Sequence, residues 1–139
     1  GVTQGGGPII RTGDASYTFD AEAEQVIIRA RDSIQKKQSE FVSQRHLMSA
    51  GSCEASAFAA NGFKSTGLAF PLGNWHNATT SIQDPRGSIG VEYISLMDYI
   101  HGIKLIEMSA RSVSSVSESL NERLRHVPDD YRMRLNVEG

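Results

Sequence analysis

The sequence has one cysteine and no long apolar run, and each shortage excludes a class of protein. Cys53 is the single cysteine among 139 residues, so an internal disulfide and a cysteine-rich zinc finger are both excluded. No stretch approaches the roughly 18 apolar residues of a membrane-spanning helix, and no signal peptide opens the sequence. We therefore expect a protein of a reducing compartment, the cytoplasm, with no membrane partner.

An excess of positive charge is also lacking. The 14 Lys and Arg residues are balanced by 16 Asp and Glu residues, which gives a net charge of −2. Arg29 and Arg31 stand among acidic residues, so no basic stripe forms, and we expect no nucleic-acid partner. A hydrophobic content of 39% is ordinary for a globular protein, and the length suits one domain over residues 1–139.

The N-terminal segment begins Gly1-Val2, without an initiator methionine. We expect that the natural N-terminus was removed or lies further upstream, and that this chain belongs to a larger protein. Residues 1–4 are expected to be flexible. The glycines at 5–7 precede a predicted strand at 9–11, whereas a phosphate loop follows its strand, and the phosphate-loop spacings are absent.

Two long helices are predicted from caps and periodicity. Asp20 is a suitable N-cap for a helix with one buried apolar face, whose outer charges we expect to be solvated. Ser95 and Asp98 form a capping box at the start of a second helix. Apolar residues surround most of that helix, which predicts deep burial against a sheet, with Gly102 as a close-packing point.

Between these helices the pattern predicts a strand at 41–48, a short helix at 53–60 capped by Ser52, and a buried strand at 63–72. Asn61-Gly62 should end the short helix. Strand, helix and strand in this order favour a mixed or parallel sheet. A polar loop at 74–90 suggests function or exposure, and a short helix near 120–127 precedes a tail at 128–139.

Two side chains at the ends of this strand–helix–strand unit are candidates for chemistry. Glu54 lies in the first turn of the short helix, where it either serves the helix dipole or faces a cleft and holds a cation or a substrate amine. His76 follows the buried strand, where α/β sheets bind ligands. Imidazole is a common zinc ligand that Asn74 or Asn77 would orient, although a loop histidine is also an ordinary surface residue.

The remaining reactive residues have no supporting pattern. His46, His101 and His126 show no metal-ligand spacing with His76, and the sequence contains no HExxH motif. We interpret His101 as structural because it lies within a predicted helix. Cys53 stands at a helix N-terminus, which favours a reactive thiolate, but no cysteine-enzyme signature surrounds it.

The segment GSCEASAFAANGFKSTGLAFPLGNWHNA at 51–78 resembles the C-terminal motif region of co-catalytic zinc aminopeptidases and related zinc exopeptidases. The similarity extends over most of residues 5–110 and includes a downstream acidic segment, Glu92-Tyr93-Ile94, before the second helix. It implies a phosphorylase/hydrolase-like α/β fold, here a partial three-layer α/β/α sandwich with a mixed sheet. It also implies that the chain is the C-terminal part of a hydrolase domain.

The resemblance assigns roles residue by residue. His76 matches the last zinc ligand, and Glu54 matches an acidic position near the active site where many relatives have Asp. Asn74 and Trp75 flank the histidine and would shape the pocket for a peptide substrate. Such enzymes hold two zinc ions, which activate water and anchor the free amine of the peptide. Their other ligands and general base would precede Gly1, so we expect weak or no zinc binding and no peptide hydrolysis by this chain alone.

Two other interpretations remain open. The chain is a non-catalytic α/β binding or regulatory module on the same fold, or it belongs to an amide hydrolase or cyclase on the zinc exopeptidase scaffold. In a partial sheet the strand edges are exposed, and we expect these edges to permit homo-oligomers.

Overall fold

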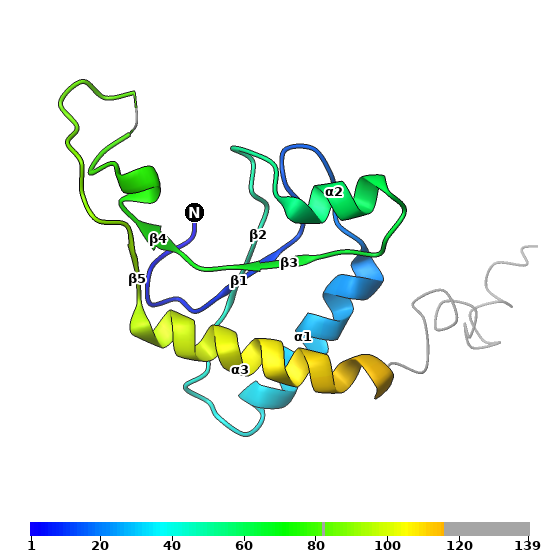
Figure 1. The fold of residues 1–139 in the computed structure, drawn as a ribbon. Coiled ribbons are helices and arrows are strands. Elements are labelled where there is room, and N and C mark those ends of the chain that lie inside the picture. The colour runs from blue at the N-terminus through cyan, green and yellow to red at the C-terminus, as the bar shows by residue number, and fades with distance from the viewer. Residues whose placement is uncertain (82, 116–139) are drawn as a thin grey trace, which may run out of the picture.

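The computed structural model describes residues 1–81 and 83–115, which form a broadly α/β arrangement (Figure 1). The predicted helix at 120–127, the tail at 128–139 and His126 lie outside the described residues. The elements are β1 (Ile9–Arg11), α1 (Ala21–Gln35), β2 (Gln44–His46), α2 (Glu54–Ala60), β3 (Gly67–Ala69), β4 (Leu72–Gly73), β5 (Tyr93–Ile94) and α3 (Leu96–Ser112), with 3-10 turns η1 (Trp75–Asn77) and η2 (Val113–Ser115).

The main sheet has the order β2-β1-β3 and is mixed, as predicted. Ile10 of β1 pairs with Arg45 of the parallel strand β2 and with Leu68 of the antiparallel strand β3. The parallel crossover therefore runs from β1 through α1 to β2, and β2 and β3 lie on opposite sides of β1. The strand–helix–strand unit formed by β2, α2 and β3 is not a parallel crossover, because β2 and β3 run in opposite directions on either side of β1.

Both of those predicted strands are also shorter than expected. β2 keeps only Gln44–His46. β3 begins at Gly67 because Phe63 belongs to the turn after α2, where its side chain is 64% exposed and contacts Phe58 edge to face. A short apolar run therefore does not distinguish a strand from an exposed turn.

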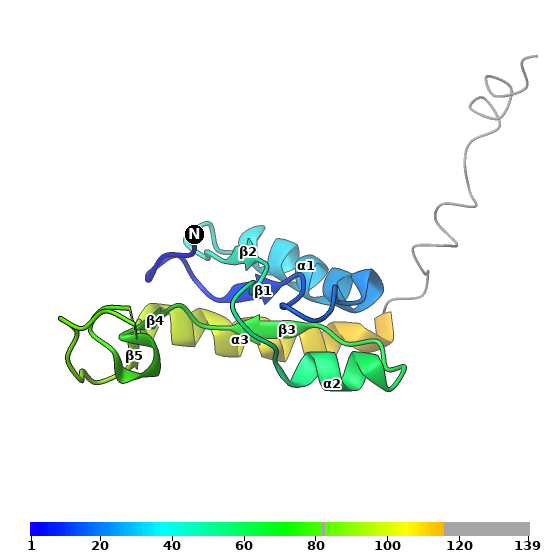
Figure 2. The ribbon, with the colours of Figure 1, turned by 90° about the horizontal axis from the view of Figure 1, so that it is seen from above.

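The core lies between the sheet and two helices. Ile10 points toward a cluster formed with Ile27, Ile34, Phe41 and Leu105. Strand side chains alternate, so Ile9 and Arg11 point to the other face of the sheet. Figures 1 and 2 show α1 and α3 on one side of the sheet, with the short α2 beside β3.

The described residues therefore form a helical layer on one face of the sheet, whereas the short helix α2, loop segments and the 3-10 turn η1 lie near the other face. The three-layer sandwich is not confirmed beyond a broadly α/β arrangement. Within residues 1–81 and 83–115, no helix is both long enough and apolar enough to span a bilayer.

Helix α1 begins as predicted. The Asp20 side chain accepts a hydrogen bond from the Ala23 N–H at 2.8 Å, which caps the helix. One charged residue of α1 contradicts the prediction that the charges on its outer side are solvated. Glu24 is 6% exposed and binds the Arg45 guanidinium through two hydrogen bonds. This ion pair connects α1 to β2.

Helix α3 also has the predicted cap, since Ser95 Oγ accepts from the Asp98 N–H at 3.5 Å. Its predicted burial is wrong: the buried face contains Asp98, His101, Gly102 and Leu105. The exposed residues include most of its large apolar side chains, namely Leu96, Met97, Tyr99, Ile100, Ile103 and Ile106. Tertiary contacts select this buried face, because two distant segments of the chain pack against Asp98 and Gly102.

Those partners are a glycine turn and a phenylalanine. Asp98 accepts hydrogen bonds from the N–H groups of Gly5 and Gly7. Phe70 packs directly on Gly102, where an added Cβ would lie 2.3 Å from Phe70 Cε1. The prediction that Gly102 is a close-packing point is confirmed. His101 is buried with its ring 4.9 Å from that of Phe41, as expected for a structural histidine.

The short helix α2 is capped differently from the prediction. Cys53 is its N-cap residue and provides no side-chain cap, while Ser52 Oγ contacts Ser16 Oγ instead. The Cys53 N–H donates to the Asp14 carboxylate at 2.8 Å, so a residue 39 positions earlier satisfies the helix start. The helix ends at Asn61, and Gly62 follows with φ of 83°, as predicted.

Candidate functional site

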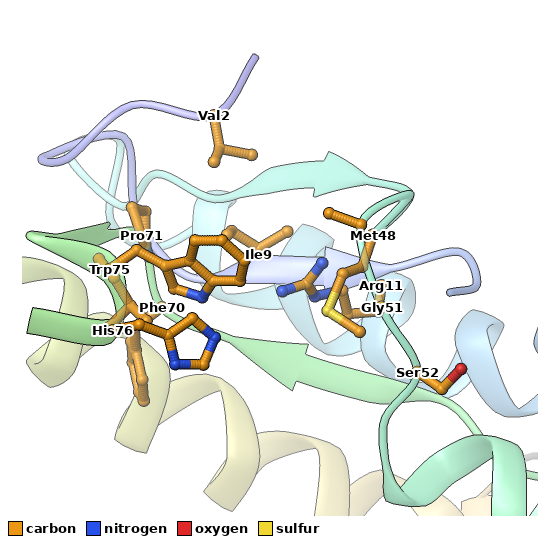
Figure 3. A pocket seen from close by; sticks show the side chains of 12 residues that line it. Val2, Ile9, Arg11, Met48, Gly51, Ser52, Phe70, Pro71, Trp75 and His76 are labelled. Carbon is orange, nitrogen blue, oxygen red and sulfur yellow. The ribbon is translucent and has the colours of Figure 1, made fainter. Parts of the chain in front are cut away.

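A cavity of about 500 Å³ lies on the face of the sheet opposite α1 and α3; we call it the Trp75 cavity (Figure 3). β1, the turn before α2 and the chain between β3 and η1 all contribute to its lining. Its polar groups come from Arg11, Ser52 and His76, and apolar side chains that include Ile9, Met48, Phe70, Pro71 and Trp75 form most of its wall. The concave, mainly apolar shape with a few polar groups is typical of a ligand site.

His76 reaches this cavity from a tight turn with unusual backbone angles. Asn74, His76 and Asn77 have φ of 51°, 57° and 60°, in the left-handed region that residues other than glycine rarely occupy. The His76 N–H donates to the Glu92 carboxylate at 2.9 Å. The imidazole is exposed, and its ring centre lies 4.2 Å from that of Trp75. Strain of this kind often marks a functional turn.

The two asparagines hold this turn in place. The Asn74 amide donates to the Val91 carbonyl at 2.9 Å, and Asn77 Oδ1 accepts from the Glu92 N–H at 3.1 Å. The Asn74 amide group thus fastens η1 to the segment before β5. The expected contact of Asn74 with a substrate stays a prediction. Both asparagines therefore position His76 through the backbone, not through a hydrogen bond to its ring.

Glu54 lies at the first position of α2, is exposed, and lines a neighbouring cavity of about 400 Å³, which we call the Glu54 cavity. Arg11 and Met48 line both cavities. Glu54 and His76 are thus placed over the same face of the sheet in adjacent cavities, and neither of these cavities is lined by both residues. Glu54 and His76 therefore do not share either cavity, and the two cavities have Arg11 and Met48 in common.

Asp14 supports the turn that lines the Trp75 cavity. Its carboxylate accepts hydrogen bonds from the Ser56 hydroxyl and from the N–H groups of Cys53, Ser16 and Tyr17. The Ser56 bond and then the backbone donors hold the pKa of Asp14 well below its usual range, against the opposing effect of burial. Asp14 is therefore a carboxylate at neutral pH, and it fixes the start of α2.

Sequence reasoning missed Arg11, Asp14 and Met48. The position of Arg11 was foreseeable, since an arginine after two isoleucines in a strand points opposite to Ile10. Asp14 carried only a weak signal, a turn beside Gly13. In the part of the chain that the structure describes, no three His, Cys, Asp or Glu side chains are grouped to hold a metal ion.

Comparison with known proteins gives no family assignment. No protein-family model matches the chain, and no curated protein sequence matches it significantly.

Proposed function

We propose that this chain is part of a zinc-dependent aminopeptidase domain that hydrolyses N-terminal peptide bonds. In this proposal His76 supplies one zinc ligand. Glu54 binds the peptide substrate, and Asn74 shapes the substrate pocket beside His76 and contacts the peptide. The observation that supports this proposal is the exposed His76 imidazole, presented by a strained turn at the rim of the Trp75 cavity. The resemblance of residues 51–78 to zinc exopeptidases supplies the reaction class.

The proposal requires further protein. Two zinc ions need several ligands each, and one imidazole supplies one of them. The surface is consistent with missing contacts, because Leu96, Ile100, Ile103 and Ile106 expose between 46% and 71% of their surface along α3. Exposed apolar areas of this kind are typical of contact with other protein. The isolated chain is expected to bind zinc weakly and to hydrolyse no peptide.

The test uses the coding sequence upstream of Gly1 and two histidine variants. An upstream segment with a His-x-Asp motif and paired acidic residues is expected, and the longer protein should hydrolyse aminoacyl anilides in the presence of zinc. His76→Ala should abolish this activity and one of two stoichiometric zinc sites. His46→Ala is the matched control, because His46 is also exposed and its ring nitrogen contacts the Leu47 carbonyl.

Three results would contradict the proposal: an upstream segment without these ligands, full activity in His76→Ala, or peptidase activity in the pure 139-residue chain, which overturns the assigned boundaries.

A second candidate is a non-catalytic α/β binding or regulatory module. It is favoured by the separation of Glu54 and His76 into two cavities and by the lack of a metal-binding group among residues 1–81 and 83–115. An amide hydrolase or cyclase on the same scaffold differs only in its substrate. Assay of the longer protein against peptide and acyl-amide substrates separates the three.

We also propose that the isolated chain associates through β3, which is an edge strand in the described sheet. Size-exclusion chromatography over a dilution series should show a concentration-dependent elution volume. A clean monomer at every concentration contradicts this.

A further inference from the structure

The guanidinium of Arg11 has no ionic partner within residues 1–81 and 83–115. None of the described ion pairs includes Arg11, and no side-chain hydrogen bond joins it to another described residue. The side chain is half-buried and points into the Trp75 cavity from the middle strand of the sheet (Figure 3). Its direction is fixed by strand alternation, because Ile10 occupies the core on the opposite face.

Arg45 on the adjacent strand shows how this fold treats a structural arginine. Its guanidinium binds both carboxylate oxygens of Glu24. Arg11 lies one strand away and lacks such a carboxylate, although removing a guanidinium from water without an acceptor is unfavourable. Glu54 lines the Glu54 cavity with Arg11 but forms no ion pair with it in the described structure. Arg11 is therefore free to bind an anion.

The lining of the Trp75 cavity determines which anion fits. Its polar side chains are Arg11, Ser52 and His76, and none of its lining residues carries a carboxylate. Ile9, Phe70 and Trp75 form apolar walls around the guanidinium. A small inorganic anion would leave these walls unfilled. An apolar or aromatic body with one carboxylate satisfies both the guanidinium and the walls.

We propose that the Trp75 cavity binds the carboxylate of an amphipathic ligand, with Arg11 as the carboxylate-binding residue. A guanidinium matches a carboxylate through two parallel hydrogen bonds, which a lysine cannot reproduce. This inference deepens the proposed function, on which it rests for the substrate class: the peptide carries a carboxylate, at its C-terminus or on an acidic side chain.

Trp75 provides the measurement, because it is the single tryptophan of the chain and lines the cavity. Its fluorescence is titrated with N-acetylphenylalanine and with N-acetylphenylalaninamide, in the presence of EDTA. The acid should bind about tenfold more tightly than the amide, as expected for a charge-assisted hydrogen bond. Added salt should weaken only the binding of the acid. Equal affinities, or no saturable binding of the acid, would overturn the proposal.

Variants test whether Arg11 is the residue that causes the preference for the acid over the amide. Arg11→Met should reduce the acid-to-amide preference to about one, as loss of the charge-assisted bond predicts, and Arg11→Lys should keep part of it. Arg29→Met is the matched control, because Arg29 is half-buried on α1, outside the cavity, and its loss should leave the preference unchanged. Circular dichroism establishes that each variant is folded, and Arg11→Gln replaces Arg11→Met if the latter unfolds. A retained preference in the folded neutral variant rejects the role of Arg11.

The source of the carboxylate is resolved with two isomeric ligands: N-acetylglutamine, which has a C-terminal carboxylate, and N-acetylglutamate α-amide, which has only a side-chain carboxylate. Tighter binding of N-acetylglutamine assigns the site to a peptide C-terminus, and tighter binding of N-acetylglutamate α-amide assigns it to an acidic side chain. EDTA keeps the experiment independent of zinc. If this titration fails while His76 of the longer protein binds zinc, only the present inference is rejected. If the carboxylate binds but the longer protein has no zinc site, the peptidase proposal is rejected.

Discussion

The carboxylate of Asp98 accepts a hydrogen bond from the Gly7 N–H at 2.8 Å, across 91 positions of the chain. Its second oxygen accepts from the Gly5 N–H at 2.9 Å, and the side chain is fully buried at the start of α3. The helix dipole favours negative charge at this position. One carboxylate thus joins the N-terminal glycine turn to α3, and the same turn connects Val2, at the rim of the Trp75 cavity, to β1.

Asp98→Asn should lower the free energy of unfolding by about 1–3 kcal/mol, because an amide nitrogen then faces a buried N–H donor. Urea unfolding followed by circular dichroism measures this loss. Glu107→Gln is the control on the same helix, since Glu107 forms an exposed pair with Arg111 and should change stability by less than about 0.5 kcal/mol. Equal stability of Asp98→Asn and the native chain would show that these two bonds contribute little.

Gly7→Ala and Gly5→Ala form a matched pair that separates backbone strain from steric exclusion. Gly5 and Gly7 have φ of 80° and 86°, so alanine introduces similar backbone strain at each. A Cβ on Gly7 would lie 2.0 Å from the Val42 carbonyl oxygen, while nothing lies within 4 Å of a Cβ on Gly5. Gly7→Ala should therefore cost about 1–3 kcal/mol more than Gly5→Ala in urea unfolding. Equal losses in the two variants contradict the packing of Gly7 on Val42.

Arg45→Met should destabilise the protein because it leaves the Glu24 carboxylate buried without a partner. The Glu24 side chain is 8% exposed and that of Arg45 is 54% exposed. We expect a loss of about 1–3 kcal/mol, less than for a fully buried pair, since water reaches the arginine side. Arg31→Met, which removes the partner of the 49% exposed Asp32 side chain, should cost less than about 1 kcal/mol, because water can solvate that carboxylate.

The double variant Glu24→Met/Arg45→Met tests whether the unpaired Glu24 carboxylate causes the loss of stability in Arg45→Met. It should recover part of the stability lost in Arg45→Met, because the unpaired carboxylate is then absent. Additive losses in thermal unfolding would show that the two residues act independently.

Local signals in the sequence predicted the helix starts well. Asp20 and Ser95 cap their helices with their own side chains, a contact over three residues that depends on little else. The start of α2 was predicted to within one residue, but its cap was wrong because the Cys53 N–H bonds to Asp14, far away in the sequence. Caps of this second kind depend on the tertiary fold, which spacing within a segment does not reveal.

The buried face of α3 was also beyond local reasoning. Apolar residues surround the helix, so periodicity does not select a face, and the contacts of Asp98 and Gly102 with distant segments decide it. His76 was predicted as a site residue because it follows a strand end, and the structure shows that it lines the Trp75 cavity. Strand alternation gives the face of the sheet on which Arg11 lies, but the lack of a carboxylate partner for Arg11 among the described residues depends on the tertiary fold.

Asp14 should make the stability of the protein depend on pH in a defined direction. Hydrogen bonds from Ser56 and from backbone N–H groups lower the folded-state pKa of Asp14. A carboxyl with a lowered folded pKa stabilises the protein above its unfolded pKa of about 4, and this stabilisation is lost as the pH falls through the folded value. Asp14 therefore contributes its full stabilisation at neutral pH and loses it in acid.

The measurement is the difference in unfolding free energy between the native chain and Asp14→Asn over a range of pH. The difference should be constant between about pH 7 and pH 5 and should shrink below about pH 4, where Asp14 takes up a proton in the unfolded state while it is still ionised in the folded state. Glu40→Gln is the control for removing one carboxylate charge, because Glu40 is exposed. If the difference between the native chain and Asp14→Asn stays constant into acid, the Asp14 carboxylate is not selectively stabilised in the folded protein. Cys53 and Ser56 would then have to be held at the start of α2 by other contacts.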